Sequence, residues 1–139
     1  MASIFTRIII GEIPGRIIWR DSTCIAMVDI RPLNRGHVLI IPIAEVDRWT
    51  DLPPDTAAHC TRVAHAVGRA QMASFAPERI GLMIAGFEVP HTHLHVVPLD
   101  HMGHLDFNQA DADADPSDLD DVAEALRATL RSAGHPEAA

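Results

Sequence analysis

Short apolar runs separated by turn-forming residues occupy most of the first hundred positions of the chain. Runs of this length, rich in isoleucine and valine, predict β-strands rather than helices. The first two runs are joined by the turn-like Asp21-Ser22 and predict a hairpin. The third is apolar on both faces, so we expect it at the centre of a sheet. The four runs are 16–20 (RIIWR), 24–30 (CIAMVDI), 37–42 (HVLIIP) and 79–85 (RIGLMIA).

Helical spacing of apolar residues marks three other segments. Ser3 precedes apolar residues at positions 4, 5, 8 and 9, which predicts a short capped helix that ends near Gly11. Pro53-Pro54 opens a helix that runs to about Phe75 with one buried stripe. A third, amphipathic helix is predicted over 119–130. Helices and consecutive strands mixed in this way predict an α+β domain with a mostly antiparallel sheet of about five strands.

The segment 91–98 (HTHLHVVP) combines strand-forming residues with three histidines, at positions 91, 93 and 95. Alternate side chains of a strand point to opposite faces. We therefore expect the three imidazoles on one face and Thr92, Leu94 and Val96 toward a core. Three imidazoles in register on a half-buried strand have no obvious packing purpose, so we expect the chemistry of the protein here.

Three interpretations of these histidines are open. Histidine is sometimes simply tolerated in a strand, which suits one residue better than three. Neutral imidazole also ligates zinc, but at ~3.3 Å per residue His91 and His95 lie about 13 Å apart, so one ion takes only a neighbouring pair. In the third interpretation, His93 is a nucleophile through one ring nitrogen, and the two flanking histidines donate hydrogen bonds to developing negative charge.

The composition predicts a single globular domain with its own core. Hydrophobic residues make up 47% of the 139 residues, yet every apolar run is short. We therefore expect no signal peptide, no membrane-spanning helix and no membrane partner. Cys24 and Cys60 are isolated in the sequence, so we expect small buried residues of a reduced, cytoplasmic protein.

The charge distribution limits the partners. The formal net charge is −8, and all 11 basic residues are arginine, which argues against nucleic-acid polymers and excludes a P-loop lysine or Schiff-base chemistry. A single nucleotide remains compatible, because backbone N–H groups and histidines can hold its phosphate. Seven aspartates between positions 106 and 121 predict a solvated loop that leads into the last helix.

Four motifs give the chain a resemblance to the histidine-triad (HIT) superfamily: SIFTRIIIGEIPGRIIWRD, MVDIRPLNRGHVLIIP, DLPPD and VPHTHLHVVP. The resemblance covers residues 3 to 98 and is strongest to the nucleoside phosphoramidase branch. It implies a homodimeric hydrolase or transferase that acts on the α-phosphate of a purine nucleotide and needs no cofactor. We expect residues 1–105 to form the HIT domain and residues 106–139 to add the acidic loop and a C-terminal helix packed on it.

The resemblance also implies roles for individual residues. His93 matches the histidine that attacks the α-phosphorus to form a nucleotidyl-histidine intermediate, and His91 and His95 match its neighbours near the phosphate. Asp29 matches the acidic residue that binds the ribose hydroxyls. His37 matches a histidine that supports the site. Positions that match the base pocket, each equally compatible with a purely structural core, are Ile4, Phe5, Ile8, Met27, Val28, Ile30, Leu39 and Val89.

The sequence departs from the family pattern at two places. Many bacterial relatives bind a structural zinc at positions that correspond here to Ser3, Thr6, Glu45 and His91, so we predict no metal. The loop before the histidines reads Ala85-Gly86-Phe87-Glu88-Val89 and lacks the usual Gln and Ser/Thr. Glu88 either repels the phosphate, points outward or donates a proton with a raised pKa.

These observations leave three functions in order of preference. The first is a nucleotidyl hydrolase or transferase for phosphoramidates or dinucleoside polyphosphates. The second is a purine-nucleotide-binding module with weak or no turnover, and the third is a metalloprotein built on the histidines.

Overall fold

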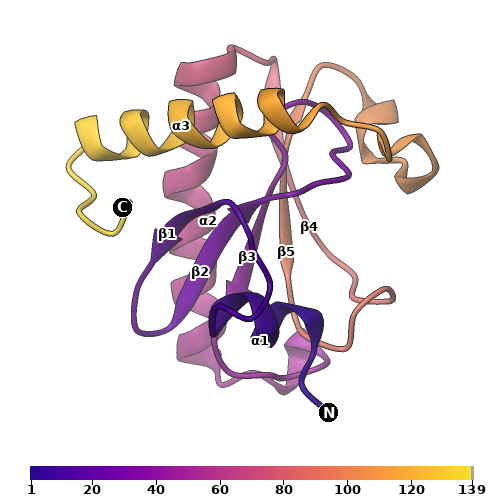
Figure 1. The fold of residues 1–139 in the computed structure, drawn as a ribbon, viewed down its shortest axis with the longest axis vertical. Coiled ribbons are helices and arrows are strands. Elements are labelled where there is room, and N and C mark those ends of the chain that lie inside the picture. Colours follow the sequence, from indigo (N-terminus) through magenta and orange to yellow (C-terminus); the bar gives the residue numbers. More distant parts are fainter. Residues whose placement is uncertain (139) are drawn as a thin grey trace.

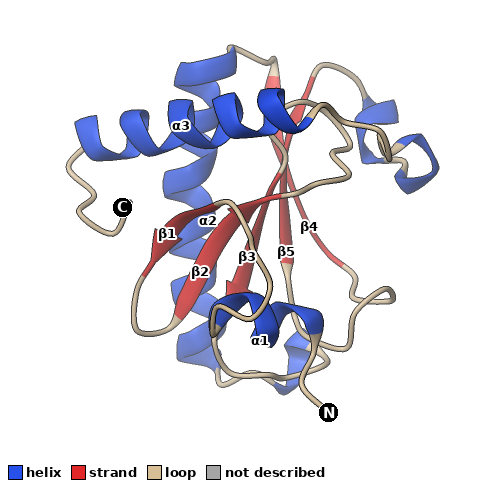
Figure 2. Cartoon of the chain, viewed as in Figure 1, coloured by secondary structure: helices blue, strands red, loops and turns tan. Residues whose placement is uncertain are grey.

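The computed structural model describes residues 1–138, so the last residue of the expected C-terminal segment, Ala139, lies outside the described part. The predicted α+β fold is confirmed. One antiparallel sheet of five strands in the order β1-β2-β3-β5-β4 carries a long helix and two shorter ones (Figures 1 and 2). The elements are α1 (Ile4–Ile9), β1 (Ile17–Arg20), β2 (Cys24–Val28), β3 (Val38–Pro42), α2 (Pro54–Phe75), β4 (Arg79–Ile84), β5 (Leu94–Leu99) and α3 (Pro116–Ser132), with 3-10 turns η1 (Trp49–Asp51), η2 (Met102–Leu105) and η3 (Phe107–Gln109).

The sheet separates two apolar layers. On one face, alternate residues of the central strands pack against the buried stripes of α2 and α3 and form the main core. On the other face, Ile25, Met27, Leu39 and Ile41 pack against Phe5 and Ile8 of α1. The strand β3 is buried along its whole length and lies in the middle of the sheet, as its apolar pattern predicted.

The long helix α2 fixes the segment that leads into β3. It begins at Pro54, a residue suited to a first helical turn, and ends at Phe75, as predicted. Ala76, the residue that follows, adopts a left-handed conformation with φ 48°. Its fully buried Gln71 donates two hydrogen bonds of 2.9 Å, to the carbonyl oxygens of Gly36 and Val96. These bonds connect α2 to the residue before His37 and to β5.

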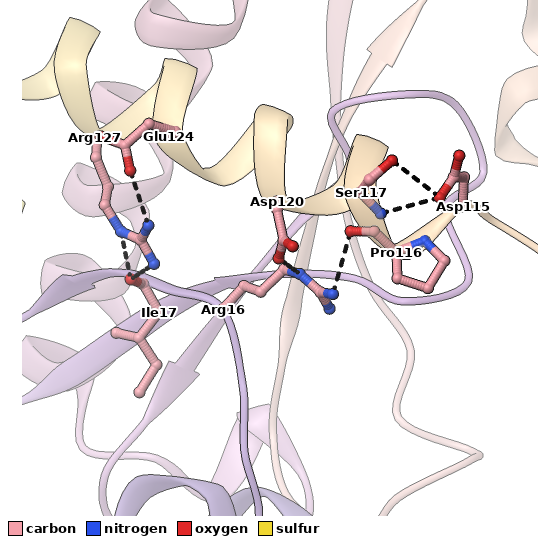
Figure 3. A network of polar contacts seen from close by, with 8 residues as sticks. All are labelled: Arg16, Ile17, Asp115, Pro116, Ser117, Asp120, Glu124 and Arg127. Atoms are coloured by element: carbon pink, nitrogen blue, oxygen red, sulfur yellow. Dashed lines mark hydrogen bonds and ion pairs between the residues drawn. The ribbon is translucent and has the colours of Figure 1, made fainter.

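The C-terminal helix α3 begins three residues before the predicted start at Leu119. Asp115 caps it and Pro116 occupies its first turn, two signals that extend a helix beyond its apolar stripe. Two arginines attach this helix to the β1 region (Figure 3). Arg16 donates to Asp120 at 2.7 Å, and Arg127 donates to the carbonyl oxygen of Ile17.

The histidine strand is shorter than predicted. We expected it to run over 91–98, but β5 begins at Leu94, so His91 and His93 precede it. The cause is Thr92, whose backbone N–H and hydroxyl both donate to the carbonyl oxygen of Val46, at 2.7 and 2.8 Å. These bonds divert the backbone from the sheet ladder. Leu94 and Val96 face the main core as expected.

Other expectations concern single residues and the membrane. Cys24 and Cys60 are free and buried, as predicted. Among residues 1–138, no helix combines the length and the apolar character that crossing a membrane requires.

Candidate active site

A cavity of about 960 Å³ opens on the sheet face that carries α1. Its volume is in the range of small-molecule sites. Most of the expected site residues line it. Met27, Leu39 and His95 are paired across three neighbouring strands and form its floor. The expected residues among its lining are Ile4, Phe5, Ile8, Met27, Val28, Asp29, Ile30, Leu39, Val89, His93 and His95.

The ring of His93 presents one free lone pair to this cavity. Its Nδ1 lies 2.7 Å from the carbonyl oxygen of His91, and because a carbonyl only accepts, Nδ1 carries the proton. In the neutral ring the lone pair is therefore on Nε2. Phe5 packs edge-on against the ring with a centroid separation of 5.0 Å, which fixes its orientation. The sequence analysis predicts a nucleophile at this position, and in the neutral ring the structure leaves one nitrogen unprotonated.

A chain of hydrogen bonds gives His95 the opposite tautomer, with its proton on Nε2 rather than Nδ1. The backbone N–H of Leu33 donates to His37 Nδ1 at 3.0 Å, so the neutral His37 ring has its proton on Nε2. That nitrogen lies 3.0 Å from His95 Nδ1, which accepts, and His95 therefore carries its own proton on Nε2. Within the described chain, this buried Nε2 has no hydrogen-bond partner. The cavity thus holds a lone pair and an N–H donor on adjacent rings.

Burial keeps the histidines around His93 neutral. It lowers the pKa of His37 to about 3 and that of His95 to about 4, and the proximity of other imidazoles adds to both shifts. Burial also lowers the pKa of His91, although the hydrogen bond to Pro42 opposes this. The tautomers of His37 and His95 described above therefore hold at neutral pH.

His91 differs from its expected placement beside the phosphate. Its ring is fully buried behind the cavity and both nitrogens are engaged, with Nε2 2.7 Å from the carbonyl oxygen of Pro42 and Nδ1 2.7 Å from Ser3 Oγ. It therefore has no donor for a substrate. Its contribution is the backbone oxygen that holds His93. His37 likewise lies behind His95 and does not line the cavity.

The four positions that correspond to the family zinc site form a hydrogen-bonded cluster. Thr6 Oγ1 and the Ser3 backbone N–H each donate to Glu45 Oε1 at 2.7 Å, and Ser3 Oγ contacts His91. The hydrogen bond from Ser3, followed by that from Thr6, lowers the pKa of Glu45. Hydroxyl groups are not zinc ligands of the usual structural sites. These residues do not fit a zinc ion, and direct hydrogen bonds connect them instead.

Two acidic side chains that the sequence analysis singled out, Asp29 and Glu88, line the cavity. Asp29 follows β2 directly, and its Oδ1 accepts from the backbone N–H of Arg31 at 2.9 Å. Burial raises its pKa, although the Arg31 bond opposes the shift. Glu88 does not point away from the site, since its Oε2 lies 3.8 Å from His93 Nε2 while its side chain remains 54% exposed.

Several lining residues were not predicted from the sequence. Phe107 in η3 contacts the His95 ring edge-on at a centroid separation of 5.0 Å. The residues missed are Ile13, Pro14, Gly15, Arg16, Arg31, Phe107, Ala110 and Asp120. Three of them, Phe107, Ala110 and Asp120, belong to the C-terminal segment and line the cavity of their own chain. His101 and His104 stack on each other outside the cavity.

Two groups of residues in the site bring potential metal ligands within 4.8 Å of one another: Asp29, His37 and His95, and Glu88, His93 and His95. Both groups include His95, whose Nδ1 accepts from His37 and whose Nε2 carries the proton. A protonated ring nitrogen has no lone pair for a metal. The donor set therefore suits attack on an electrophile better than metal binding.

The comparisons with known proteins identify the family. The HIT domain model matches residues 10–102. The chain belongs to the HIT family. An uncharacterized HIT-like protein of Mycobacterium tuberculosis strain H37Rv is 36% identical over 103 residues, which cover 70% of this chain and 72% of that protein. The crystal structure of a Zn-bound histidine triad family protein from Mycobacterium smegmatis superposes with a TM-score of 0.82 at 32% identity, covering 96% of both chains.

More distant HIT relatives include nucleotide hydrolases with different leaving groups. An adenosine 5'-monophosphoramidase of Schizosaccharomyces pombe is 28% identical over 70% of this chain and 74% of its own length. An adenylylsulfatase of Arabidopsis thaliana is 32% identical over 68% of this chain and 51% of its own length. A bifunctional bis(5'-adenosyl)-triphosphatase/adenylylsulfatase of the same plant is 33% identical over 61% of this chain and 50% of its own length.

Proposed function

We propose that this HIT protein is a nucleotidyl hydrolase or transferase that attacks the α-phosphate of a purine nucleotide and forms a nucleotidyl-His93 intermediate. The observation that carries the proposal is the pairing of two ring nitrogens in one cavity. His93 Nε2 has a free lone pair because its Nδ1 is bonded to the His91 carbonyl oxygen, and His95 Nε2 offers a proton beside it. A nucleophile next to a fixed donor is the arrangement that phosphoryl transfer needs.

The rest of the cavity supports a nucleotide. Apolar side chains from α1, β2 and β3 form a surface that suits a purine ring. Asp29 also lines the cavity, with Oδ1 held by the Arg31 N–H. Its Oδ2 lies 3.5 Å from His37 Nε2 and retains a lone pair that can accept from a ribose hydroxyl. In this proposal His37 positions His95, and His91 positions His93.

The proposed reaction has two steps. First, the His93 Nε2 lone pair forms a bond to the α-phosphorus, the bond from phosphorus to the leaving group breaks, and the leaving group takes up a proton from solvent. His95 Nε2–H donates to the phosphate oxygen that gains charge. Water then attacks the same phosphorus and releases a proton to solvent, the P–N bond to His93 breaks, and a nucleoside monophosphate leaves. When an alcohol or amine replaces water, the same steps give a transferase.

We further propose an amine as the leaving group. The Glu88 carboxyl group lies 3.8 Å from His93 Nε2 and lines the same cavity, so its charge acts on any group bound to the α-phosphorus. A carboxylate there repels a sulfate or a polyphosphate, and it attracts an amine, whose departure from phosphorus requires a proton. This supports a phosphoramidate over a dinucleoside polyphosphate or an adenylyl sulfate.

The same contact supports the second candidate, a nucleotide-binding module with weak or no turnover. An ionised Glu88 repels the phosphate as well as an anionic leaving group, and so opposes attack. Tight AMP binding without hydrolysis of phosphoramidates, adenylylated lysine or dinucleoside polyphosphates is the outcome that favours this candidate.

A labelling experiment tests the proposal. The protein is mixed with an adenosine phosphoramidate labelled at the α-phosphate, quenched with acid-free denaturant and analysed by peptide mass spectrometry. We expect the label on His93 and a loss of turnover of at least about 10³-fold in His93→Asn, with AMP binding retained. Label on another residue, or a normal rate in His93→Asn, contradicts the covalent role.

We also propose a cytoplasmic homodimer, consistent with a nucleotide substrate and two free cysteines. The edge strand β4 supports the dimer, because it ends the sheet order and exposes apolar side chains, with Leu82 51% and nearby Phe87 97% exposed. Light scattering of the wild type and of Leu82→Glu tests this: we expect a dimer that the substitution dissociates.

A further inference from the structure

Seven charged or titratable side chains line the cavity, and the proposed reaction uses four of them. It assigns two histidines to the phosphorus, Glu88 to the leaving group and Asp29 to the ribose. Arg16, Arg31 and Asp120 have no role in it. Two of these three, Arg16 and Asp120, hold each other by a hydrogen bond of 2.7 Å. A nucleotide whose phosphate and ribose are bound still presents the polar edge of its base, which needs a partner of this kind.

The backbone places Arg16 beside the apolar surface of the cavity. Its carbonyl oxygen accepts from the Val28 N–H at 3.0 Å, so Arg16 is one strand spacing, about 4.8 Å, from the residue that precedes Asp29. The residue before it, Gly15, packs so closely on the apolar surface that an added Cβ atom would lie 2.7 Å from the Ile8 side chain. Arg16 therefore borders both the carboxylate proposed for the ribose and the surface proposed for the base.

The pair has hydrogen-bonding capacity left for a ligand. Arg16 Nε donates to Asp120 Oδ1, and Arg16 Nη2 donates to the carbonyl oxygen of Pro116 at 3.3 Å (Figure 3). Within residues 1–138, no hydrogen bond reaches Asp120 Oδ2 or leaves Arg16 Nη1. Since the Asp120 side chain is 69% exposed, the ion pair contributes little to stability. Its geometry is thus fixed from one side and open on the other.

We propose that Asp120 and Arg16 bind the edge of the base and make the cavity selective for guanine nucleotides, an inference that rests on the proposed function. Guanine carries the N1–H and N2–H donors side by side and the O6 acceptor next to them. The two oxygens of a carboxylate match the two donors, and a guanidinium N–H matches O6. Adenine offers the single N6 donor group, and its N1 is an acceptor that a carboxylate repels.

The pairing with Arg16 also makes a carboxylate acceptable in this cavity. An isolated Asp120 repels an anionic nucleotide, whereas the positive charge 2.7 Å away offsets that repulsion. The next residue, Asp121, is exposed and does not line the cavity. It therefore provides a matched control on the same helix, with the same charge and no access to the base.

Calorimetric titration with GMP, IMP and AMP tests this inference without relying on turnover. We expect GMP to bind at least about tenfold more tightly than AMP, because a hydrogen bond to a charged group is gained and the repulsion of N1 is absent. IMP keeps N1–H and O6 but lacks the N2 amino group, so we expect its affinity to lie between those of GMP and AMP.

Variants assign the selectivity to one carboxylate. In Asp120→Asn, we expect GMP binding to weaken until its advantage over AMP is about twofold or less. The substitution is nearly isosteric and the side chain is exposed, so the variant is expected to fold. Asp121→Asn is expected to keep the wild-type ratio of the two affinities.

The outcomes separate this inference from the proposed function. Equal affinities for GMP and AMP in the wild type, or an unchanged ratio in Asp120→Asn, overturn the guanine selectivity, while label on His93 still supports the nucleotidyl transfer. Absence of binding of all three nucleotides overturns both proposals.

Discussion

Individual ring nitrogens define the chemistry of the candidate site. The alternation in HTHLHVVP was sufficient to predict that His93 and His95 face one surface. It did not predict which nitrogen of each ring carries a proton. The groups that orient the supporting rings, Leu33 N–H at His37 and Pro42 O and Ser3 Oγ at His91, are separated from those histidines by 4, 49 and 88 residues. They leave no periodic signal in the sequence.

Glu88 is the residue at which substrate preference can be tested most directly. We expect Glu88→Gln to lower kcat for an adenosine phosphoramidate by about tenfold, because the negative charge that attracts the departing amine is lost. The same change removes negative charge and is expected to raise turnover of an adenylyl sulfate. Steady-state kinetics with both substrates measure the two effects. A parallel change for both substrates would contradict selection by charge.

His37 is a positioning residue whose effect depends on one donor. In His37→Leu the proton donated to His95 Nδ1 is missing, so we expect kcat to fall by roughly ten- to a hundredfold with little change in KM. His37→Gln places an amide N–H where the ring Nε2 was, and is expected to recover most of the rate. Equal rates in the two variants would assign His37 a purely packing role.

The short helix α1 shows how one element serves both stability and the site. Ser3 Oγ accepts from the Thr6 N–H at 3.1 Å as the helix cap, and the same oxygen contacts His91 at 2.7 Å. The cap was predicted from the sequence, because Ser3 precedes a helical pattern. The contact with His91 was not, although the resemblance to zinc-binding relatives had grouped these positions.

Ser3→Ala tests this double function. Loss of the cap costs about 1 kcal/mol, and an unpaired buried His91 Nδ1 costs about 1–3 kcal/mol more, so we expect the free energy of unfolding to fall by about 2–4 kcal/mol. Urea unfolding measures the change. Ser22→Ala, at an exposed turn, is the control and is expected to stay within about 0.5 kcal/mol of the wild type.

The element η3 contributes Phe107 to the cavity, which the sequence did not predict. A single aromatic residue in an acidic stretch has no periodic pattern, and only the fold brings it to His95. An edge-to-face pair contributes about 0.5–1.5 kcal/mol, so Phe107→Ala is expected to weaken AMP binding by about three- to tenfold. Calorimetric titration checks this, with the exposed Met102→Ala as control. Unchanged affinity would show that Phe107 does not contact the ligand.

At the scale of the whole molecule, sequence patterns predicted the class, the strands and the central position of β3. Apolar runs report burial directly, so these predictions are robust. The predicted beginning of β5 was wrong, because the hydrogen bonds from Thr92 to Val46 depend on a loop more than 40 residues away. The predicted start of α3 was three residues too late, because an apolar stripe does not show where a polar first turn begins.

Acid is expected to destabilise the fold through the buried histidines. The pKa values of His37, His91 and His95 lie below the ordinary value of 6.5, so the unfolded chain binds more protons below that pH. The free energy of unfolding should therefore fall as pH drops from 6.5 toward 4. The raised pKa of Asp29 favours the folded state as pH drops, but this is one group, whereas three histidines act in the other direction.

Urea midpoints at pH 7 and pH 5 measure this dependence. We expect a smaller pH dependence in His95→Gln and an unchanged one in His65→Gln, whose histidine is exposed. Equal midpoints of the wild type at the two pH values would contradict the assigned neutral rings.

The walls of the cavity come from residues as far apart in sequence as Ile4 and Asp120. A partly synthesised or locally opened chain therefore cannot present the same receptor. If a mononucleotide occupies it at 100 times its Kd, the intact molecule gains about 2.7 kcal/mol over every incomplete form. Cellular nucleotide would then act as a chemical chaperone, and resistance to proteolysis would follow its concentration.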